Sequence, residues 1–182
     1  MLVLGKCGSY NIFNRNYEGI VMSRWKNINA DSGEKTWLTP KHIIDALGHF
    51  DTDPCCPPNM PWRTADRMLT KSDDGTTSPW IGRVWCNPPY GREAIPFLRR
   101  MSCYEGGGIV LIFTRTDTDA WQSLVFPFAH SILFLKGRLR FCRTDGTYGD
   151  CATAPSALVS YSQFDTNALS NSGIKGTLVK LK

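Results

Sequence analysis

The chain has 182 residues, 42% of them hydrophobic, and a formal net charge of +5 at pH 7. This length supports one ordinary hydrophobic core, so a single domain is expected. No apolar run is long enough to cross a membrane and the first residues are too weakly basic for a signal peptide, so we expect a cytoplasmic protein with no membrane partner. Seven cysteines without a CxxC pair indicate reduced thiols and no metal site.

Residues 1–30 are rich in Asn, Gly, Ser and Arg and show no hydrophobic periodicity. Such a composition predicts a poorly ordered N-terminal arm. Met22 lies within this arm and is a second candidate for the natural start of the protein. The folded domain is expected over residues 31–182.

The rest of the chain alternates between helical and strand patterns of hydrophobic residues. Helices are predicted over residues 39–48, 64–69, 95–101 and 117–125, the first with Thr39 as its N-cap and Pro40 as its first residue. Strands are predicted over residues 50–54, 80–86, 109–113, 131–135, 138–142 and 157–161, with 177–181 as an additional edge strand. Strands 131–135 and 138–142 are expected to pair through a turn at Lys136-Gly137.

This order of elements predicts an α/β open sheet in one domain, parallel in its centre with antiparallel strands at one edge. Ligands of such sheets bind beyond the carboxyl ends of the strands. Asp53 and Asn87 each stand at the carboxyl end of a predicted strand. We therefore expect these two side chains to lie close together.

The segment Asn87-Pro88-Pro89-Tyr90 directly follows a predicted strand. The two prolines lack N–H groups and fix φ, so the chain cannot continue as a sheet there. The Asn87 side-chain carbonyl and the Pro88 backbone carbonyl can then project together beside the Tyr90 ring. Two acceptors and an aromatic face suit a planar substrate with an exocyclic amine, such as a nucleobase. A Pro-rich turn with a capping Asn is the alternative interpretation.

This segment resembles the catalytic motif of amino-group methyltransferases that use S-adenosylmethionine, whose acceptors include adenine N6, guanine N2 and a protein glutamine amide. Further segments in order are similar to the phage-type DNA N6-adenine methyltransferase (Dam) family: Trp37-Leu38-Thr39-Pro40, Phe50-Asp51-Thr52-Asp53-Pro54-Cys55, Asp74-Gly75, residues 80–91, residues 114–118 and residues 137–141. The resemblance implies a Rossmann-like, S-adenosylmethionine-dependent fold. It also implies a phage or prophage enzyme that acts on double-stranded DNA in the cytoplasm of a bacterial host.

The resemblance implies that residues of the matching segments contact the cofactor. Thr39 and Pro40 would approach the methionine part of S-adenosylmethionine, and Asp53 would accept from its ammonium group. Asp74, or alternatively Asp66, would reach the ribose hydroxyls or the adenine amine, although an Asp-Gly turn also explains Asp74. The remaining expected cofactor residues are Trp37, Pro54, Cys55 and Asn87, with a buried Trp at a helix entry as the alternative for Trp37. Residues 53–58 stand where larger methyltransferases carry a Gly-rich loop.

The resemblance also makes Asn87, Pro88, Pro89 and Tyr90 the expected catalytic residues. The N6 lone pair of adenine is delocalised into the ring, so acceptors at Asn87 Oδ1 and the Pro88 carbonyl would direct it and stabilise the developing charge. Tyr90 would stack on an adenine flipped out of the duplex.

Three further residues are expected near DNA. Phe141 is a candidate second wall for the base, with a core aromatic as the alternative. Arg115 and Arg138 are candidates for phosphate contacts, with surface ion pairing as the alternative. A methyltransferase acting on RNA or protein glutamine, and a catalytically silent DNA-binding module, remain rival functions. A monomer is favoured.

Overall fold

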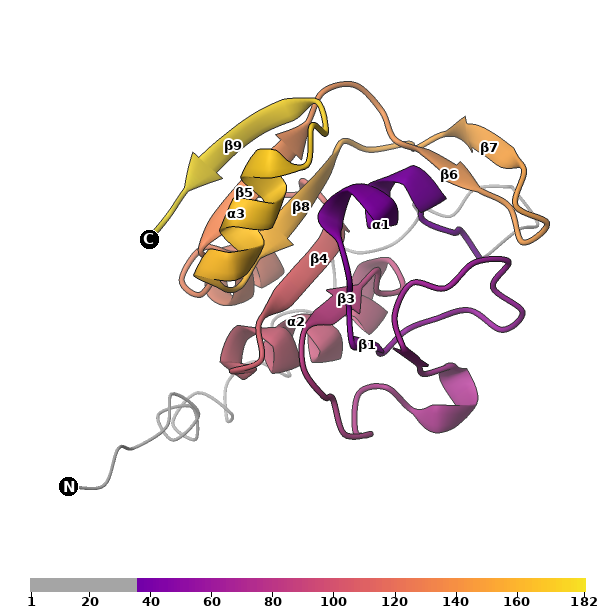
Figure 1. Cartoon of the computed structure of the whole chain (residues 1–182). Helices are drawn as coiled ribbons and strands as arrows, with labels where there is room; N and C mark the ends of the chain where they lie inside the picture. Colours follow the sequence, from indigo (N-terminus) through magenta and orange to yellow (C-terminus); the bar gives the residue numbers. More distant parts are fainter. Residues whose placement is uncertain (1–35) are drawn as a thin grey trace. The chain divides into compact units, whose positions relative to one another are not determined.

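The computed structural model describes residues 36–182, which form a mixed α/β unit (Figure 1). The helical elements are α1 (Lys41–Leu47), η3 (Lys71–Asp73), η4 (Gly91–Glu93), α2 (Ala94–Cys103), η5 (Trp121–Val125) and α3 (Gln163–Asn171). The strands are β1 (Thr52–Asp53), β2 (Arg67–Met68), β3 (Val84–Cys86), β4 (Gly108–Phe113), β5 (Ser131–Leu135), β6 (Arg140–Cys142), β7 (Tyr148–Cys151), β8 (Ser156–Ser160) and β9 (Gly176–Lys180). The expected N-terminal arm, with Met22, lies outside the described residues.

Seven strands form the central sheet in the order β2-β1-β3-β4-β8-β5-β9. The first four strands are parallel to one another, and β8, β5 and β9 continue the sheet by antiparallel pairing. The predicted α/β sheet with antiparallel pairing at one edge is therefore confirmed. The parallel strands are not confined to the centre, however, because they continue to the opposite edge at β2.

The helix predicted over residues 64–69 is wrong, because this segment adds an edge strand to the sheet. The backbone of β2 pairs with β1, and Leu69 N donates to Asp53 O at 2.8 Å. These bonds satisfy the backbone without a helical turn. Thr39 is also not the cap of α1: Pro40 occupies that position, one residue later than predicted.

The predicted hairpin between residues 131–135 and 138–142 is also wrong. β5 lies between β8 and β9, whereas β6 pairs with β7 in a separate two-stranded sheet and bridges to Leu38. The continuous apolar sequence of β5 is suited to a strand with neighbours on both sides. β7 and α3 were not predicted. Helix α3 has the sequence QFDTNALSN and buries Asp165, Thr166 and Leu169, so it carries no apolar stripe for a sequence pattern to detect.

The sheet separates two hydrophobic clusters, because successive side chains of a strand point to opposite faces. Helix α2 and η5 pack on one face, and α1 and α3 pack on the other. The strand residues of the first cluster include Val84, Cys86, Val110, Ile112, Ile132 and Val159. Those of the second include Trp85, Ile109, Leu111, Leu133 and Leu158. The predicted helical faces over residues 39–48 and 95–101 are therefore confirmed as core.

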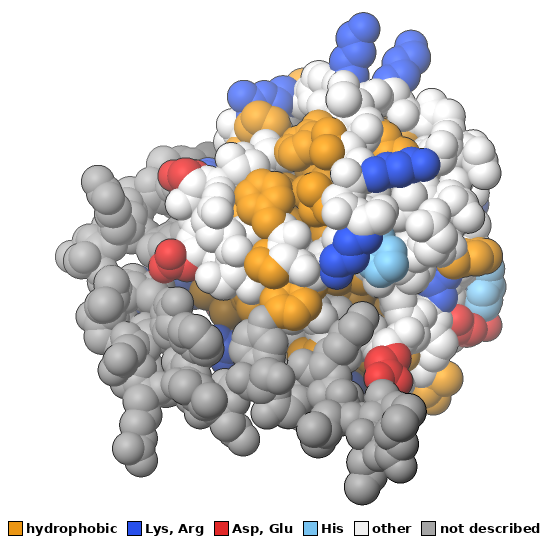
Figure 2. All heavy atoms as spheres, turned by 90° about the vertical axis from the view of Figure 1, so that its left-hand side faces the viewer, with side chains coloured by type: hydrophobic (Ala, Val, Ile, Leu, Met, Phe, Trp, Pro, Cys, Tyr) orange, Lys and Arg blue, Asp and Glu red, His pale blue; other side chains and the backbone are white. Residues whose placement is uncertain are grey.

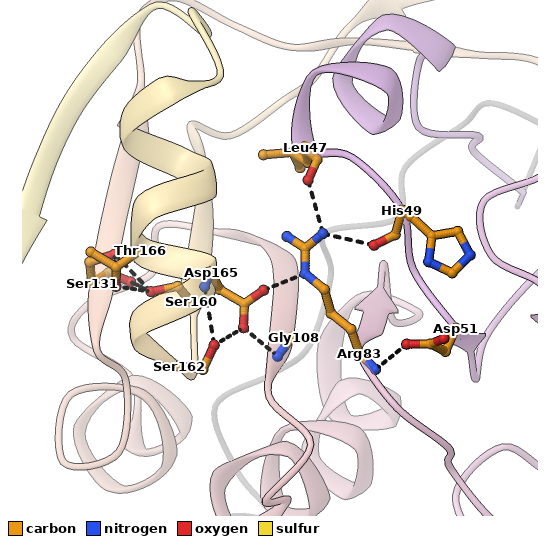
Figure 3. Close-up of polar contacts among 10 residues, drawn as sticks. All are labelled: Leu47, His49, Asp51, Arg83, Gly108, Ser131, Ser160, Ser162, Asp165 and Thr166. Carbon is orange, nitrogen blue, oxygen red and sulfur yellow. Dashed lines mark hydrogen bonds and ion pairs between the residues drawn. The ribbon is translucent and has the colours of Figure 1, made fainter.

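A buried ion pair joins the amino ends of β3 and β4 to helix α3 (Figure 3). Arg83 Nε donates to Asp165 Oδ1 at 2.6 Å, and Gly108 N donates to Asp165 Oδ2 at 2.7 Å. Ser162 caps α3 and also donates to the Asp165 carboxylate. This network lies at the amino ends of the parallel strands, whereas Asn87 lies beyond the carboxyl end of β3.

Strand β9 is the last strand on one side of the sheet that residues 36–182 form. Its side of the molecule presents apolar side chains together with Lys and Arg side chains (Figure 2). Val179 is 40% exposed and Leu181 is 38% exposed, and Lys175, Lys180 and Lys182 accompany them. Charged side chains on an edge strand oppose pairing with another sheet. No helix among residues 36–182 has the length and apolar character needed to span a bilayer.

Candidate active site

The segment Asn87-Pro88-Pro89-Tyr90 links the carboxyl end of β3 to η4 and α2. All three residues of β3 are buried. Pro88 is buried, while Pro89 and Tyr90 are exposed. The segment thus leaves the core at the edge of the sheet where the carboxyl ends of β1, β3 and β4 meet, as expected for a ligand site in an open sheet.

Within the described residues, one end of the Asn87 side-chain amide forms a hydrogen bond and the other does not. Asn87 Nδ2 donates to the backbone oxygen of Trp37 at 3.4 Å. Asn87 Oδ1 is buried and has no hydrogen-bond partner among the described residues. Since buried acceptors are normally paired, an unpaired one at this position marks a place where a ligand donor fits.

The Tyr90 ring lies against two other aromatic rings. It stacks on Phe113 with 4.1 Å between ring centroids and 2° between ring planes, and it meets Phe141 edge-on at 6.1 Å. Phe141 is only 3% exposed, whereas Tyr90 is 37% exposed. Phe141 is therefore a core aromatic, which was the alternative interpretation, and it also lies beside Tyr90.

Phe113 was not predicted as part of the site. It is the last residue of β4, the strand beside β3. Its position at the end of a predicted strand was the available signal, but the partner of that strand could not be known from the sequence.

Asp53 is buried at the carboxyl end of β1, next to β3 in the sheet. Burial raises its pKa from 3.8 to about 6, against hydrogen bonds that lower it. Cys55 N donates to Asp53 Oδ1 at 3.0 Å, and the Thr64 hydroxyl donates to Asp53 Oδ2. Thr64 is a site residue that the sequence did not indicate, because it fell within the helix that we predicted wrongly.

Two thiols connect the Asp53 segment to the Asn87 segment. Cys55 Sγ lies 3.5 Å from Cys86 Sγ, and Cys86 directly precedes Asn87. This contact confirms that the carboxyl ends of β1 and β3 lie side by side. Burial raises the pKa of the Cys55 thiol well above its usual range. A thiol held in this protonated form is a poor nucleophile.

The segment Trp37-Leu38-Thr39-Pro40 closes another side of the site. Leu38 pairs with Cys142 of β6 through two backbone hydrogen bonds of 2.9 Å. Trp37 packs on Gly149 of β7 so closely that a Cβ there would lie 2.3 Å from the indole. Thr39 Oγ1 is buried without a hydrogen-bond partner in the described part of the chain. The segments that contain Thr39 and Asn87 are neighbours, and each has a buried oxygen without a hydrogen-bond partner among residues 36–182.

The Asp74-Gly75 turn lies against the Asp53-Pro54-Cys55 segment. A Cβ on Gly75 would be 1.6 Å from the backbone oxygen of Pro54. The exposed Asp74 carboxylate accepts from Thr76 and Thr77, and the Thr76 hydroxyl lies 2.5 Å away. These hydrogen bonds lower the pKa of Asp74. The Asp-Gly turn is therefore present, and it is adjacent to the expected cofactor segment.

Asp66, the alternative to Asp74, is not brought to this site. It precedes β2 at the amino ends of the parallel strands, where its carboxylate lies 3.0 Å from His49 Nε2. His49, Asp51 and Asp66 form a cluster with ligand atoms within 4.8 Å of one another. Asp51 already accepts from Arg83 N at 2.6 Å.

The two arginines expected near DNA lie in different surroundings. Arg115 is half-buried just beyond the carboxyl end of β4, and its backbone N donates to Phe113 O at 2.8 Å. Arg138 is exposed and lines a cleft of about 540 Å³ that does not include residues 87–90. The structure therefore leaves Arg115 two residues from Phe113, the stacking partner of Tyr90, and places Arg138 in a separate hollow.

A family model described as DNA N-6-adenine-methyltransferase (Dam) matches residues 26–176. The match covers more than half of the chain and includes every site residue described above. A search of curated proteins found no match.

Proposed function

The chain belongs to the DNA N-6-adenine-methyltransferase (Dam) family, and on this premise we propose that it transfers a methyl group from S-adenosylmethionine to N6 of an adenine flipped out of double-stranded DNA. The observation that carries the proposal is the buried Asn87 Oδ1 beyond the carboxyl end of β3, which has no hydrogen-bond partner within residues 36–182. An acceptor without a donor suits an exocyclic amine, which brings N–H groups to it.

The proposed chemistry needs directed acceptors more than a strong base. Hydrogen bonds from the adenine amine to Asn87 Oδ1 and to the Pro88 carbonyl would localise the N6 lone pair and stabilise positive charge as the new bond forms. The proton leaves readily once the nitrogen carries the methyl group. The hydrogen bond from Asn87 Nδ2 to the backbone of Trp37 holds the amide in the orientation that this role requires.

Tyr90 is the proposed stacking surface for the target adenine. Its ring is partly exposed, and Phe113 supports one of its faces. A ring supported in this way is held in place before the base arrives, so less side-chain entropy is lost on binding. Adenine inside a duplex cannot reach such a surface, which is why the proposal includes base flipping.

The residues around Asp53 fit S-adenosylmethionine as the methyl donor. When bound, this cofactor supplies an electrophilic methyl group on a sulfonium. Asp53 would accept from its ammonium group, Thr39 Oγ1 would pair with a polar group of its methionine part, and Trp37, Pro40, Pro54 and Cys55 would border it. Asp74 would face the ribose after releasing its threonine partners. The parallel pairing of β1 with β3, which brings their carboxyl ends together, supports a Rossmann-like cofactor site at this position.

Methyl transfer to RNA, methyl transfer to a protein glutamine and binding without catalysis remain the competing functions. Tritium transfer from labelled S-adenosylmethionine to DNA, RNA and protein acceptors separates the first two from the proposal. Adenine methylation of plasmid DNA from expressing cells, compared with an Asn87→Ala control, tests it directly. Plasmid adenines that stay unmethylated with the unaltered protein would rule the proposal out.

A further inference from the structure

The cleft of about 540 Å³ that Arg138 lines lies between α1, the link from β5 to β6 and the link from α3 to β9. Its lining contains no acidic side chain. The basic residues that line it are His42, Lys136, Arg138, Arg140 and Lys175. We call this hollow the basic cleft.

The positive charges of the basic cleft have no acidic partner in the described part of the chain. Lys136 N donates to Lys175 O at 2.9 Å, so two lysines are held side by side by the backbone. None of the ion pairs found among residues 36–182 includes a residue of the cleft. Asp45 on α1 is already paired with Lys41 at 2.6 Å. Like charges gathered in this way repel one another unless an anion lies between them.

The basic cleft opens on the same edge of the sheet as the candidate active site. β5 runs in the same direction as β4, because each is antiparallel to β8. Its carboxyl end, which leads into Lys136, therefore lies at the edge where Phe113 stacks on Tyr90.

Strand β6 forms the boundary between the basic cleft and the active site. Arg140 lines the cleft with its guanidinium 5.6 Å from the centre of the Tyr148 ring, while the next residue, Phe141, contacts Tyr90. Successive side chains of a strand point to opposite faces, so β6 serves both sites at once. Figure 1 shows β6 and β7 beside the amino end of α1, the helix that forms another wall of the cleft.

We propose that the basic cleft binds the sugar–phosphate backbone of the DNA duplex next to the flipped adenine, an inference that rests on the proposed function. Phosphates supply the anions that the cleft lacks, and Lys and Arg are the side chains that contact them most often. Tyr148, which is 52% exposed, would lie against a sugar. Contacts of this kind position the duplex and carry no sequence information.

The test compares the full chain with a variant that carries three changes in the cleft, Lys136→Ala/Arg138→Ala/Lys175→Ala. The control is Lys180→Ala, because Lys180 is exposed at the carboxyl end of β9 and pairs with Ser131 at the amino end of β5, whereas the cleft lies beyond the carboxyl end of β5. Binding of a fluorescent DNA duplex of about 25 base pairs is measured from about 50 to about 200 mM salt. The far-UV circular dichroism spectrum and the midpoint of thermal unfolding report whether each variant folds, so this readout does not depend on the proposed function.

We expect the triple variant to bind the duplex at least about tenfold more weakly at low salt, with the slope of log Kd against log salt reduced by about 2–3. The Lys180→Ala control should keep both values. If the triple variant does not fold, the single change Lys136→Gln replaces it, with an expected reduction in slope of about 1. An unchanged slope for the triple variant would overturn the inference. The same holds if, in a parallel measurement with single-stranded RNA, the triple variant loses affinity for the RNA but keeps its affinity for the duplex.

The proposed function and the basic cleft can fail separately. Methylation of DNA by the unaltered chain, together with unchanged DNA binding by the triple variant, would retain the function and overturn the cleft. Loss of duplex binding in the triple variant would support the cleft, and absence of methyl transfer by the unaltered chain would then count against the function alone.

Discussion

At the residue scale, the two ends of the Asn87 amide have different surroundings. Nδ2 is bonded to the backbone of Trp37, and Oδ1 is buried without a partner among residues 36–182. Asn87→Ala should lower kcat about 10²–10³-fold, the usual cost of removing one group that stabilises a transition state by hydrogen bonding. The dissociation constant of S-adenosylmethionine should change only a few-fold.

Tritium transfer to DNA and calorimetry with S-adenosylmethionine measure the two effects of Asn87→Ala separately. The matched control is Asn167→Ala, since Asn167 is an exposed residue of α3. Equal turnover of the Asn87→Ala variant and the unaltered protein would remove Asn87 from the mechanism.

Asp53 should make the stability of the protein depend on pH. Its folded pKa of about 6 lies above the ordinary value of 3.8, so the folded state holds the proton more tightly than the unfolded chain does. This group therefore favours the folded state at low pH, and that advantage is lost as the pH rises from about 4 to about 6, by about 3 kcal/mol in total. In Asp53→Asn this contribution to the pH dependence should vanish.

Urea unfolding of the unaltered protein and of Asp53→Asn between about pH 4 and about pH 8 measures this difference. The stability of the variant relative to the unaltered protein should increase as the pH rises toward the folded pKa and stay level above it. A difference in stability that does not change with pH would mean that Asp53 has an ordinary pKa in the folded protein.

At the element scale, the Arg83–Asp165 pair connects helix α3 to the amino ends of β3 and β4. The side chains are 11% and 1% exposed, so removing either one would leave the other as a buried charge with neutral hydrogen-bond partners but no opposite charge beside it. Asp165→Ala should therefore lower the free energy of unfolding by about 3–5 kcal/mol. Thermal or urea unfolding measures the loss, and Glu105→Ala, at an exposed turn residue, is the control. A loss equal to that of the control would show that α3 is held by its apolar contacts alone.

At the scale of the whole molecule, binding of S-adenosylmethionine should stabilise the described domain as one unit. A ligand present at about a hundred times its dissociation constant adds about 2.7 kcal/mol to the stability of the state that binds it. For a domain of this size that corresponds to an increase in Tm of about 5–10 °C. Thermal unfolding with and without the cofactor tests this, and an unchanged Tm would favour a DNA-binding module without catalysis.

Several elements follow from local patterns and others do not. The helices with apolar residues at regular spacing and the strands with continuous apolar runs lie close to where the sequence places them, because each buries a face that its own residues define. The helix predicted over residues 64–69 is a strand, since its backbone pairs with β1. Helix α3 was missed because its buried surface includes Asp165 and Thr166, whose partners come from other elements.

The sequence alone indicates the chemistry that one short segment offers, because two prolines after a strand, an amide and an aromatic ring are adjacent in the chain and their combination needs no knowledge of packing. It also determined that Asp53 and Asn87 share an edge, because both end strands of an open sheet. Three features became visible only in the folded protein: the stacking of Phe113 on Tyr90, the hydrogen bond from Thr64 to Asp53, and the basic cleft. These contacts join residues far apart in the chain, and which strands become neighbours depends on the energy of the whole packed sheet.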